Sequence, residues 1–302
     1  KGRSISAPGV AASALAACDI VFLVSSDDVA LKLAPSLAKN GVWTIDDSAA
    51  FRLDKNIPLV IPEVNSSALT ATRRLIASPN CTMTGLAVAG SLLHREIGIR
   101  EIRLASYQAV SGAGKAAVGE LLAQQTELRG LSLESDGRAP VLDPGKSASL
   151  PRAIAFNAIP QVGRFGADGY STEEIKVAAE LRKIWSAPGL KISTTAVRVP
   201  TIRGHALAAW MTLSRPITLA RVRALLKRTP GLVLSSAGDY PTPRSAGGKS
   251  PVLAGRLRQG ASPKEIALWI VSDNLLKGAA LNSIQIAEEL VRRGWLKPRQ
   301  TP

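Results

Sequence analysis

The stretch DIVFLVSSDDVALKLAPSLAKNGVWTID, residues 19–46, indicates how the first part of the chain folds. It opens with a short apolar run that is typical of a buried strand. Asp27 can then cap a helix that is kinked or restarted at Pro35 and stops at Asn40-Gly41. A second apolar run, residues 42–45, predicts the next strand. A strand, a helix and a strand in this order favour a parallel sheet of βαβ units.

The rest of the chain is less regular. Strands are expected at residues 58–61, 75–77, 101–108, 191–199, 206–213 and 268–271, helices at about 115–128, 218–227 and 278–293, and loop-like stretches at 130–152 and 238–255. We therefore predict an α/β protein with two domains. A Rossmann-type domain, residues 1–82 plus 274–302, carries an inserted α+β substrate domain, residues 83–273.

The composition is that of an ordinary globular protein. With 302 residues, 46% hydrophobic and 20% charged, the chain can bury a large core. No apolar run approaches the ~20 residues needed to cross a bilayer, and the N-terminus lacks a signal-peptide pattern. The two cysteines, Cys18 and Cys81, make no disulfide framework, and no Cys/His cluster has metal-ligand spacing. We therefore expect a protein without a metal in the reducing cytoplasm.

The net charge of +15 raises the question of a polyanionic partner. The basic residues are dispersed, however, and the densest pairs are Arg73-Arg74 and Arg292-Arg293. The five Trp and three Tyr are not interleaved with them, as a nucleic-acid stacking surface would need. We therefore expect neither a nucleic acid nor a membrane as partner.

Cys81 is the candidate nucleophile. It stands in SPNCTMTG, residues 78–85, between an apolar run and a long apolar helix. At a helix N-terminus the unpaired backbone N–H groups and the macrodipole favour the thiolate, which is the reactive form of cysteine. The alternative is a small buried hydrophobe, as most free cysteines are.

Nine short segments along the chain form an ordered series. They are DDSAAFR (46–52), PLVIPEVN (58–65), SPNCT (78–82), SYQAVSGAGK (106–115), FNAIP (156–160), DGYSTEEIK (168–176), RVP (198–200), GH (204–205) and SDNLLKGAA (272–280). The series resembles aspartate-semialdehyde dehydrogenase of the amino-acid biosynthetic type. The segments run in that family's order over nearly the whole chain, so together they are far more specific than any single motif.

The resemblance implies reduction of L-aspartyl 4-phosphate to L-aspartate 4-semialdehyde, a step of lysine, threonine and methionine biosynthesis, with NADPH as reductant. It implies Cys81 as nucleophile, Gln108 as the amide that orients the acyl carbonyl, and His205 as general acid/base. His205 would take the thiol proton and return one to the hemithioacetal oxygen. The other histidine, His94, would lie ~20 Å from Cys81 along a helix over residues 82–94, so it cannot be the base. The family is dimeric through the inserted domain, so we expect a homodimer.

The same motifs supply the substrate-binding residues. Arg198 would hold the α-carboxylate bidentately and Glu173 the α-ammonium. Arg52 and Lys176 are the phosphate candidates, with Asn80 beside the nucleophile. Glu173 and Lys176 are three residues apart on one helical face, so an ordinary solvated pair is the alternative.

Ser171 and Glu174 form a capping box, which predicts a helix that starts near Glu173 and directs its N-terminus at the site. For Gln108 the alternative is a polar group at a strand end that faces solvent. For His205 the alternative is a structural histidine.

NADP is the expected cofactor. Ser25 and Ser26 follow the first strand where the family carries a small turn, and Ser111, Gly112 and Asn274 match positions on the nicotinamide side. A glycine-rich phosphate loop should precede that strand, but none occurs before residue 19. We expect such a segment upstream, in a chain that is an N-terminal truncation or an incomplete gene model. The alternative is a family member without the loop.

Four residues depart from the family pattern, namely Met83, Asp47, Ala206 and Leu207, and none of them removes a catalytic group. Asp47 could repel an anionic ligand. Two other functions stay open. N-acetyl-glutamyl-phosphate reductase shares the cysteine–histidine chemistry, but its motif is typically GCYPT, unlike NCT at residues 80–82. A noncatalytic paralogue that acts in binding or assembly would explain the absent loop but not the retained catalytic set.

Overall fold

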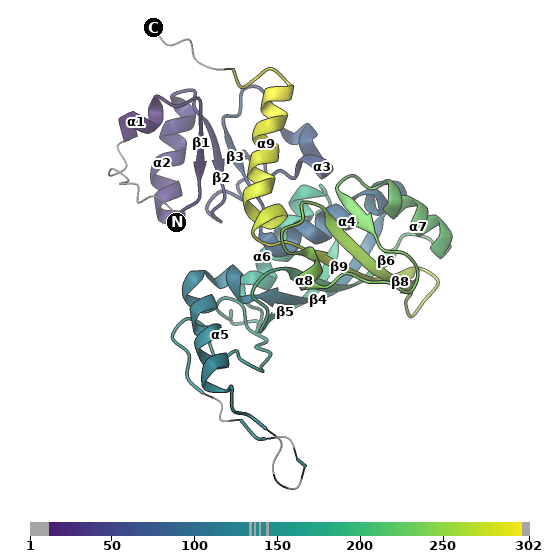
Figure 1. The fold of residues 1–302 in the computed structure, drawn as a ribbon. Helices are drawn as coiled ribbons and strands as arrows, with labels where there is room; N and C mark the ends of the chain where they lie inside the picture. The colour runs from purple at the N-terminus through teal and green to yellow at the C-terminus, as the bar shows by residue number, and fades with distance from the viewer. Residues whose placement is uncertain (1–11, 133–134, 136, 139, 143–144, 298–302) are drawn as a thin grey trace. The chain divides into compact units, whose positions relative to one another are not determined.

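The structure is a computed structural model that describes residues 12–132, 135, 137–138, 140–142 and 145–297 (Figure 1). The chain divides into two compact units. The first comprises Lys1–Pro79 with Asn282–Pro302, and the second comprises Asn80–Leu281. The second unit therefore contains Cys81 and residues 274–281, which the sequence analysis placed in the first domain.

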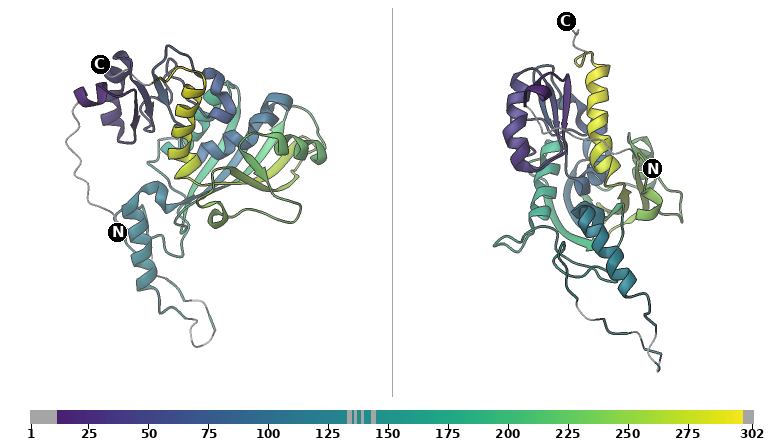
Figure 2. Two further views of the ribbon diagram at one scale, coloured as in Figure 1. Left: turned by 45° about the horizontal axis from the view of Figure 1, so that its top comes forward. Right: turned by 60° about the vertical axis from the view of Figure 1, so that its left-hand side comes forward.

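A parallel three-stranded sheet forms the centre of the first unit. Its described elements are α1 (Ala12–Ala16), β1 (Ile20–Leu23), α2 (Asp27–Lys39), β2 (Trp43–Asp46), α3 (Pro62–Asn65), η1 (Ser66–Ala68), β3 (Leu75–Ala77) and α9 (Leu281–Arg292). The strand order is β1-β2-β3, with Ile20 beside Trp43 and Thr44 beside Leu75. Helices α2 and α9 lie on opposite faces of this sheet (Figures 1 and 2). The predicted Rossmann-type parallel sheet is thereby confirmed.

Residues from both ends of the chain form the core of this unit. Trp43 and Ile45 of β2 pack with Ile286 and Leu290 of α9. The indole of Trp43 also stacks on that of Trp295, with ring centroids 6.4 Å apart. The C-terminal helix α9 therefore completes the hydrophobic core of a sheet whose strands come from the N-terminal part of the chain.

Two local details of this unit differ from the sequence prediction. Helix α2 is continuous from Asp27 to Lys39, so it does not restart at Pro35, which was one of the two alternatives expected there. Pro35 is exposed, so the missing N–H and the ring are accommodated toward solvent. Residues 58–61 form a single bridge, from Leu59 to Ala77, rather than a strand.

A mixed six-stranded sheet forms the centre of the second unit. Its described elements are α4 (Cys81–Ile97), β4 (Ile99–Ala109), η2 (Val110–Ala113), α5 (Lys115–Glu127), α6 (Thr172–Ile184), β5 (Lys191–Val199), β6 (His205–Leu213), α7 (Leu219–Arg228), β7 (Leu232–Leu234), α8 (Pro243–Ala246), β8 (Val252–Gln259), β9 (Glu265–Ser272) and the π-helix η3 (Leu276–Ala280). The strand order is β5-β4-β6-β9-β8-β7. Strand β4 pairs in parallel with β5 and antiparallel with β6. This unit is the α+β part of the predicted fold.

Helix α4 is largely buried within the second unit. Its residues from Thr82 to Gly90 are all buried, and it packs against β4, β6, β8, β9, α6, α7 and η3. A helix that is apolar on all sides must be buried to be stable. Burial of α4 therefore brings its first residue, Cys81, against the ends of several strands.

The strand register brings three predicted site residues to one end of the sheet. Gln108 of β4 pairs with Arg198 of β5. His205 begins β6, whose next residue, Ala206, pairs with Tyr107 of β4. Residues far apart in the sequence thereby become neighbours.

Two further expectations need correction. The stretch 238–255, expected as a loop, contains α8 and the first half of β8. The final helix begins at Leu281 rather than at residue 278, because η3 precedes it, and it ends before Gly294, which has a φ of +69°. Among the described residues no helix is long and apolar enough to cross a membrane, and no group of three His, Cys, Asp or Glu is placed to hold a metal.

Candidate active site

Cys81 and His205 face each other in the second unit. The Sγ of Cys81, at the first residue of α4, lies 3.5 Å from Nε2 of His205, at the first residue of β6. The Asn80 side chain caps α4 by accepting the N–H groups of Thr82 at 2.7 Å and Met83 at 3.4 Å. The predicted helix N-terminus at Cys81 is confirmed, and the positive end of the helix dipole lies at the sulfur.

His205 is buried, and its ring is neutral at neutral pH. Burial, together with the positive charge of Arg198, lowers the pKa of His205 from the usual 6.5 to about 3. Its Nδ1 accepts the backbone N–H of Ala109 at 3.1 Å, so the neutral ring carries its proton on Nε2, the atom that faces Sγ. The predicted transfer of the Cys81 proton to this ring does not fit that tautomer, because Nε2 already carries a proton. The tautomer does fit a hydrogen bond from Nε2–H to a thiolate, or proton donation from Nε2 to an oxygen.

Glu173 is the centre of a network that joins three groups around the nucleophile. Its two carboxylate oxygens accept hydrogen bonds from Nδ2 of Asn80, at 3.1 and 3.0 Å. Its Oε1 also accepts the hydroxyl of Thr82 at 3.0 Å and Nε2 of Gln108 at 3.3 Å. The carboxylate therefore lies between the start of α4 and the end of β4.

The start of α6 explains how Glu173 reaches this position. The predicted capping box is confirmed, because Ser171 accepts the N–H of Glu174 and the Glu174 side chain accepts the N–H of Ser171. Lys176, one turn further on, is half-buried. Glu173 is therefore directed at the site rather than being a solvated partner of Lys176.

Arg198 is the buried cation of the site, with 5% of its surface exposed. Its Nη1 donates to the carbonyl oxygen of Ala109 at 2.8 Å. Burial lowers the pKa of Arg198, while the charges of Cys81 and Glu173 raise it. The guanidinium is thus close enough to both groups to stabilise a thiolate.

Gly112 packs closely against Arg198 and His205. A Cβ at this position would lie 3.0 Å from Nη1 of Arg198 and 3.2 Å from Nε2 of His205. A side chain at this position would crowd both groups, so glycine permits the close approach of η2 to them.

Asn274 ties two loops of the site together. Its Nδ2 donates to the hydroxyl of Ser111 at 2.9 Å, and its Oδ1 accepts the N–H of Gly204 at 2.8 Å. Asn274 and Ser111, both predicted to bind cofactor, therefore also hold η2 against the residue that precedes His205.

The remaining predicted residues belong to the first unit. Ser25 and Ser26 are exposed after β1, and Ser26 is the N-cap of α2. Arg52 donates from Nε to the carbonyl of Ser78 at 2.9 Å and from Nη2 to the carbonyl of Asp47 at 2.7 Å. Their roles stay predictions.

Two residues that were not predicted as site residues contact the nucleophile's segment. Glu180, which is buried, accepts the backbone N–H of Asn80 at 2.7 Å. A Cβ on Gly278 would lie 2.8 Å from the Cβ of Cys81. Two features of the sequence could have indicated them. Glu180 follows Glu173 by seven residues and so lies on the same side of the helix, and Gly278 belongs to the SDNLLKGAA segment.

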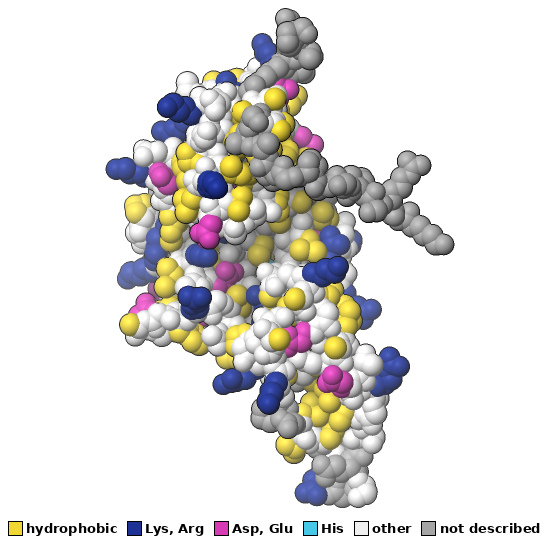
Figure 3. Space-filling model, turned by 90° about the vertical axis from the view of Figure 1, so that its left-hand side faces the viewer, with side chains coloured by type: hydrophobic (Ala, Val, Ile, Leu, Met, Phe, Trp, Pro, Cys, Tyr) yellow, Lys and Arg dark blue, Asp and Glu magenta, His cyan; other side chains and the backbone are white. Residues whose placement is uncertain are grey.

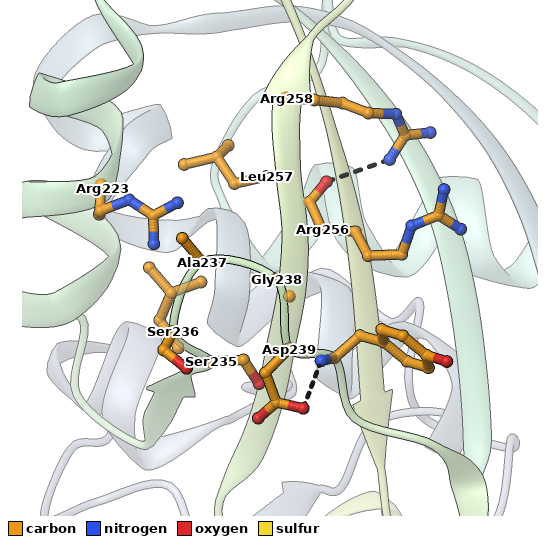
Figure 4. A pocket seen from close by; sticks show the side chains of 12 residues that line it. Arg223, Ser235, Ser236, Ala237, Gly238, Asp239, Arg256, Leu257 and Arg258 are labelled. Atoms are coloured by element: carbon orange, nitrogen blue, oxygen red, sulfur yellow. Dashed lines mark hydrogen bonds between the residues drawn. The ribbon is translucent and has the colours of Figure 1, made fainter.

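A hollow of about 420 Å³ lies beside β8, apart from Cys81 and His205 (Figure 4). Arg256 and Arg258 extend to one side of this strand, whereas Leu257 and Arg223 lie on the other (Figure 4). Because the guanidinium groups do not converge, we assign no anion to it. Lys and Arg side chains are likewise scattered over the face drawn in Figure 3, without a single cluster.

Known proteins with this sequence pattern identify the family. The model for "Semialdehyde dehydrogenase, dimerisation domain" matches residues 91–277, and that for "Semialdehyde dehydrogenase, NAD binding domain" matches residues 3–72. The aspartate-semialdehyde dehydrogenase of Shewanella violacea is 41% identical over 279 residues, which cover 90% of this chain and 79% of the relative. The chain belongs to the aspartate-semialdehyde dehydrogenase family.

Other members agree. The aspartate-semialdehyde dehydrogenase of Bacillus subtilis is 38% identical over 295 residues, which cover 96% of this chain and 84% of that one. The crystal structure of aspartate semialdehyde dehydrogenase II from Vibrio cholerae complexed with ASA superposes with a TM-score of 0.84 at 39% identity, covering 92% of this chain and 81% of that one. The resemblance found in the sequence is confirmed, and these relatives favour the aspartate-semialdehyde dehydrogenases over the N-acetyl-glutamyl-phosphate reductases.

Proposed function

We propose that the chain catalyses the NADPH-dependent reductive dephosphorylation of L-aspartyl 4-phosphate to L-aspartate 4-semialdehyde, a step of lysine, threonine and methionine biosynthesis. The observation that carries the proposal is the 3.5 Å contact between Sγ of Cys81, at a capped helix N-terminus, and Nε2 of the buried His205. A noncatalytic binding protein has no need of this arrangement. The similarity to the V. cholerae enzyme complexed with ASA supports the substrate.

In the proposed reaction Cys81 attacks as a thiolate. The N-terminus of α4, the Nε2–H of His205 and the charge of Arg198 stabilise the anion. Sγ bonds to the acyl carbon, and the bond from that carbon to the phosphate oxygen breaks. Inorganic phosphate departs, and the acyl group remains bound to Cys81 as a thioester. The amide of Gln108, at the end of β4, orients the carbonyl oxygen.

His205 acts as a proton donor in the second half of the reaction. Reduction of the thioester gives a hemithioacetal whose oxygen is negative, and the neutral ring donates its Nε2 proton to that oxygen. The proton returns to Nε2 as the carbon–sulfur bond breaks and the aldehyde leaves. The lowered pKa of His205 keeps the ring in the neutral donor form near neutral pH.

The buried charges are the proposed determinants of substrate recognition. Arg198 binds the α-carboxylate with its planar fork. Glu173 binds the α-ammonium. The ammonium group then takes the place of neutral hydrogen-bond donors that surround the Glu173 carboxylate in the structure. Lys176, Arg52 and the amide of Asn80 are the proposed phosphate ligands.

The absence of a side chain at Gly112 lets the backbone of η2 lie close to Arg198 and His205. Ser111, Gly112 and Asn274, with Ser25 and Ser26 of the first unit, are the proposed residues that hold the dinucleotide. NADPH, when bound, supplies the hydride that reduces the thioester. The match of residues 3–72 to an NAD binding domain supports a nicotinamide dinucleotide, and the choice of NADP is part of the proposal.

A homodimer through the open face of the six-stranded sheet is also part of the proposal. Gly85 of α4 lies close to Ile270, so Trp269, the neighbour of Ile270 on β9, points to the opposite face. Trp269 packs against Tyr107, which is 37% exposed. Exposed aromatic residues are typical of interfaces, and residues 91–277 match a dimerisation domain. Sedimentation analysis that finds a monomer at every concentration would contradict this assembly.

The cytoplasm is the proposed compartment. Both Cys18 and Cys81 are free thiols, and the proposed chemistry needs the second one reduced.

Kinetics in the reverse direction, with aspartate semialdehyde, NADP and phosphate, test the proposed function. Arg198→Lys keeps the charge but loses the two-pronged geometry, so it should mainly raise the Michaelis constant for the aldehyde. His205→Ala should mainly lower the turnover number, by roughly 10²–10⁴-fold. The same kinetic signature in both variants would contradict the two roles, and a wild-type chain without turnover would contradict the function.

A further inference from the structure

Helix α6 brings a second carboxylate to the start of the nucleophile's helix. Glu180 follows Glu173 by seven residues, which is about two turns, so both project from the same side of α6. Glu180 is 1% exposed, and its Oε2 accepts the backbone N–H of Asn80 at 2.7 Å. Asn80 is the residue immediately before Cys81.

The two carboxylates hold Asn80 at both of its nitrogen atoms. Glu173 accepts the side-chain Nδ2, and Glu180 accepts the backbone N–H. The carbonyl oxygen of Asn80 in turn accepts the N–H of Thr84 at 3.1 Å. The peptide units on both sides of the Asn80 Cα are therefore held, the Pro79–Asn80 unit by Glu180 and the Asn80–Cys81 unit by Thr84.

We infer that Glu180 is a positioning residue, which fixes the backbone of Asn80 and thereby the direction of the Cys81 sulfur toward His205. The inference rests on the proposed role of Cys81 as nucleophile. A hydrogen bond from an N–H to a carboxylate is stronger than one to a neutral acceptor, which suits a contact that must hold a reactive group in place. A displacement of the reacting atom by ~1 Å costs roughly 10²-fold in rate.

Alkylation of Cys81 by iodoacetamide tests the inference without substrate or cofactor, and steady-state kinetics provide a second readout. Glu180→Leu removes the acceptor, so the alkylation rate and the turnover number should both fall, by roughly 10²-fold for the latter, with little change in the Michaelis constant for aspartate semialdehyde. Glu180→Gln keeps a neutral and therefore weaker acceptor oxygen in nearly the same shape, so its rates should lie between those of the wild type and Glu180→Leu. If Glu180→Leu does not fold, Glu180→Asp, which is too short to keep the contact, replaces it.

Glu265 offers a matched control elsewhere in the same unit. It is also buried and accepts a backbone N–H, that of Ala261 at 2.9 Å, and it begins β9, at the opposite end of this strand from Ser272, which pairs with His205. Glu265→Leu should lower the melting temperature without slowing alkylation of Cys81. Folded Glu180→Leu that reacts like the wild type, or equal slowing by Glu265→Leu, would overturn the inference. Absence of dehydrogenase turnover in the wild type would refute the proposed function instead, since alkylation needs no turnover.

Discussion

Gly278→Ala should lower the activity of the site, because the added Cβ would clash with the backbone and Cβ of Cys81. A Cβ on Gly278 would lie 2.8 Å from Cβ, 3.0 Å from Cα and 3.1 Å from the carbonyl oxygen of Cys81. Carbon atoms in contact prefer ~3.5–4.0 Å, so η3 and the first turn of α4 must separate by up to about 1 Å. Overpacking of this kind costs ~1–3 kcal/mol of stability. The accompanying displacement of Sγ should lower the turnover number by roughly 10²-fold.

Turnover, alkylation of Cys81 and thermal unfolding of the same preparation measure these effects. Gly119→Ala is the control, since a Cβ at this position in α5 has nothing within 4 Å. That variant should keep full activity and gain ~0.5–1 kcal/mol from its helix position. Wild-type turnover and alkylation in Gly278→Ala would refute the argument that this glycine sets the position of Cys81.

Three other predictions concern the same groups. Gly112→Ala should lower the turnover number, because its Cβ would lie 3.0 Å from Nη1 of Arg198 and 3.2 Å from Nε2 of His205 and would displace them; unchanged steady-state kinetics would count against the need for a glycine beside these two groups. Cys81→Ser should abolish acyl-phosphate reduction while Cys18→Ser leaves it intact, and equal alkylation of both thiols would count against the assignment of the nucleophile. The pKa of His205 is about 3 in the folded protein and near 6.5 when unfolded, so the unfolded chain binds more protons between these values. The free energy of unfolding should therefore fall as the pH drops from 6.5 toward 3, by up to about 1.4 kcal/mol per pH unit from this group. Urea unfolding of His205→Asn should lack that component, and equal pH slopes in the two proteins would contradict it.

The elements that the sequence predicted well are those in which local periodicity and capping agree. Strands β1, β2, β5 and β6 and the capping box at Ser171 are examples, because buried runs and cap residues act within a few positions. Strand β8 was missed for a local reason. A bulge between Gly255 and Arg258, with Arg256 at a φ of +54°, interrupts the two-residue alternation, and the flanking residues are rich in Gly, Pro and Ser.

Motifs located the candidate site residues, but they could not describe the contacts between them. The N–H of Ala109 that sets the tautomer of His205, and the carboxylate of Glu180 that holds Asn80, come from segments about 100 residues away from their partners. The lowered pKa of His205 likewise follows from burial in the assembled unit. Such properties depend on tertiary packing, which no local pattern contains.

The central claim is that Cys81 carries the acyl group during the reaction. Incubation with freshly prepared L-aspartyl 4-phosphate in the absence of a nicotinamide cofactor, followed by acid quenching, proteolysis and mass spectrometry, tests it directly. We predict one aspartyl group on the peptide that contains Cys81, released by hydroxylamine and absent from Cys81→Ser. An aspartyl group on another residue, or an unmodified Cys81 peptide while phosphate is released, would contradict the account.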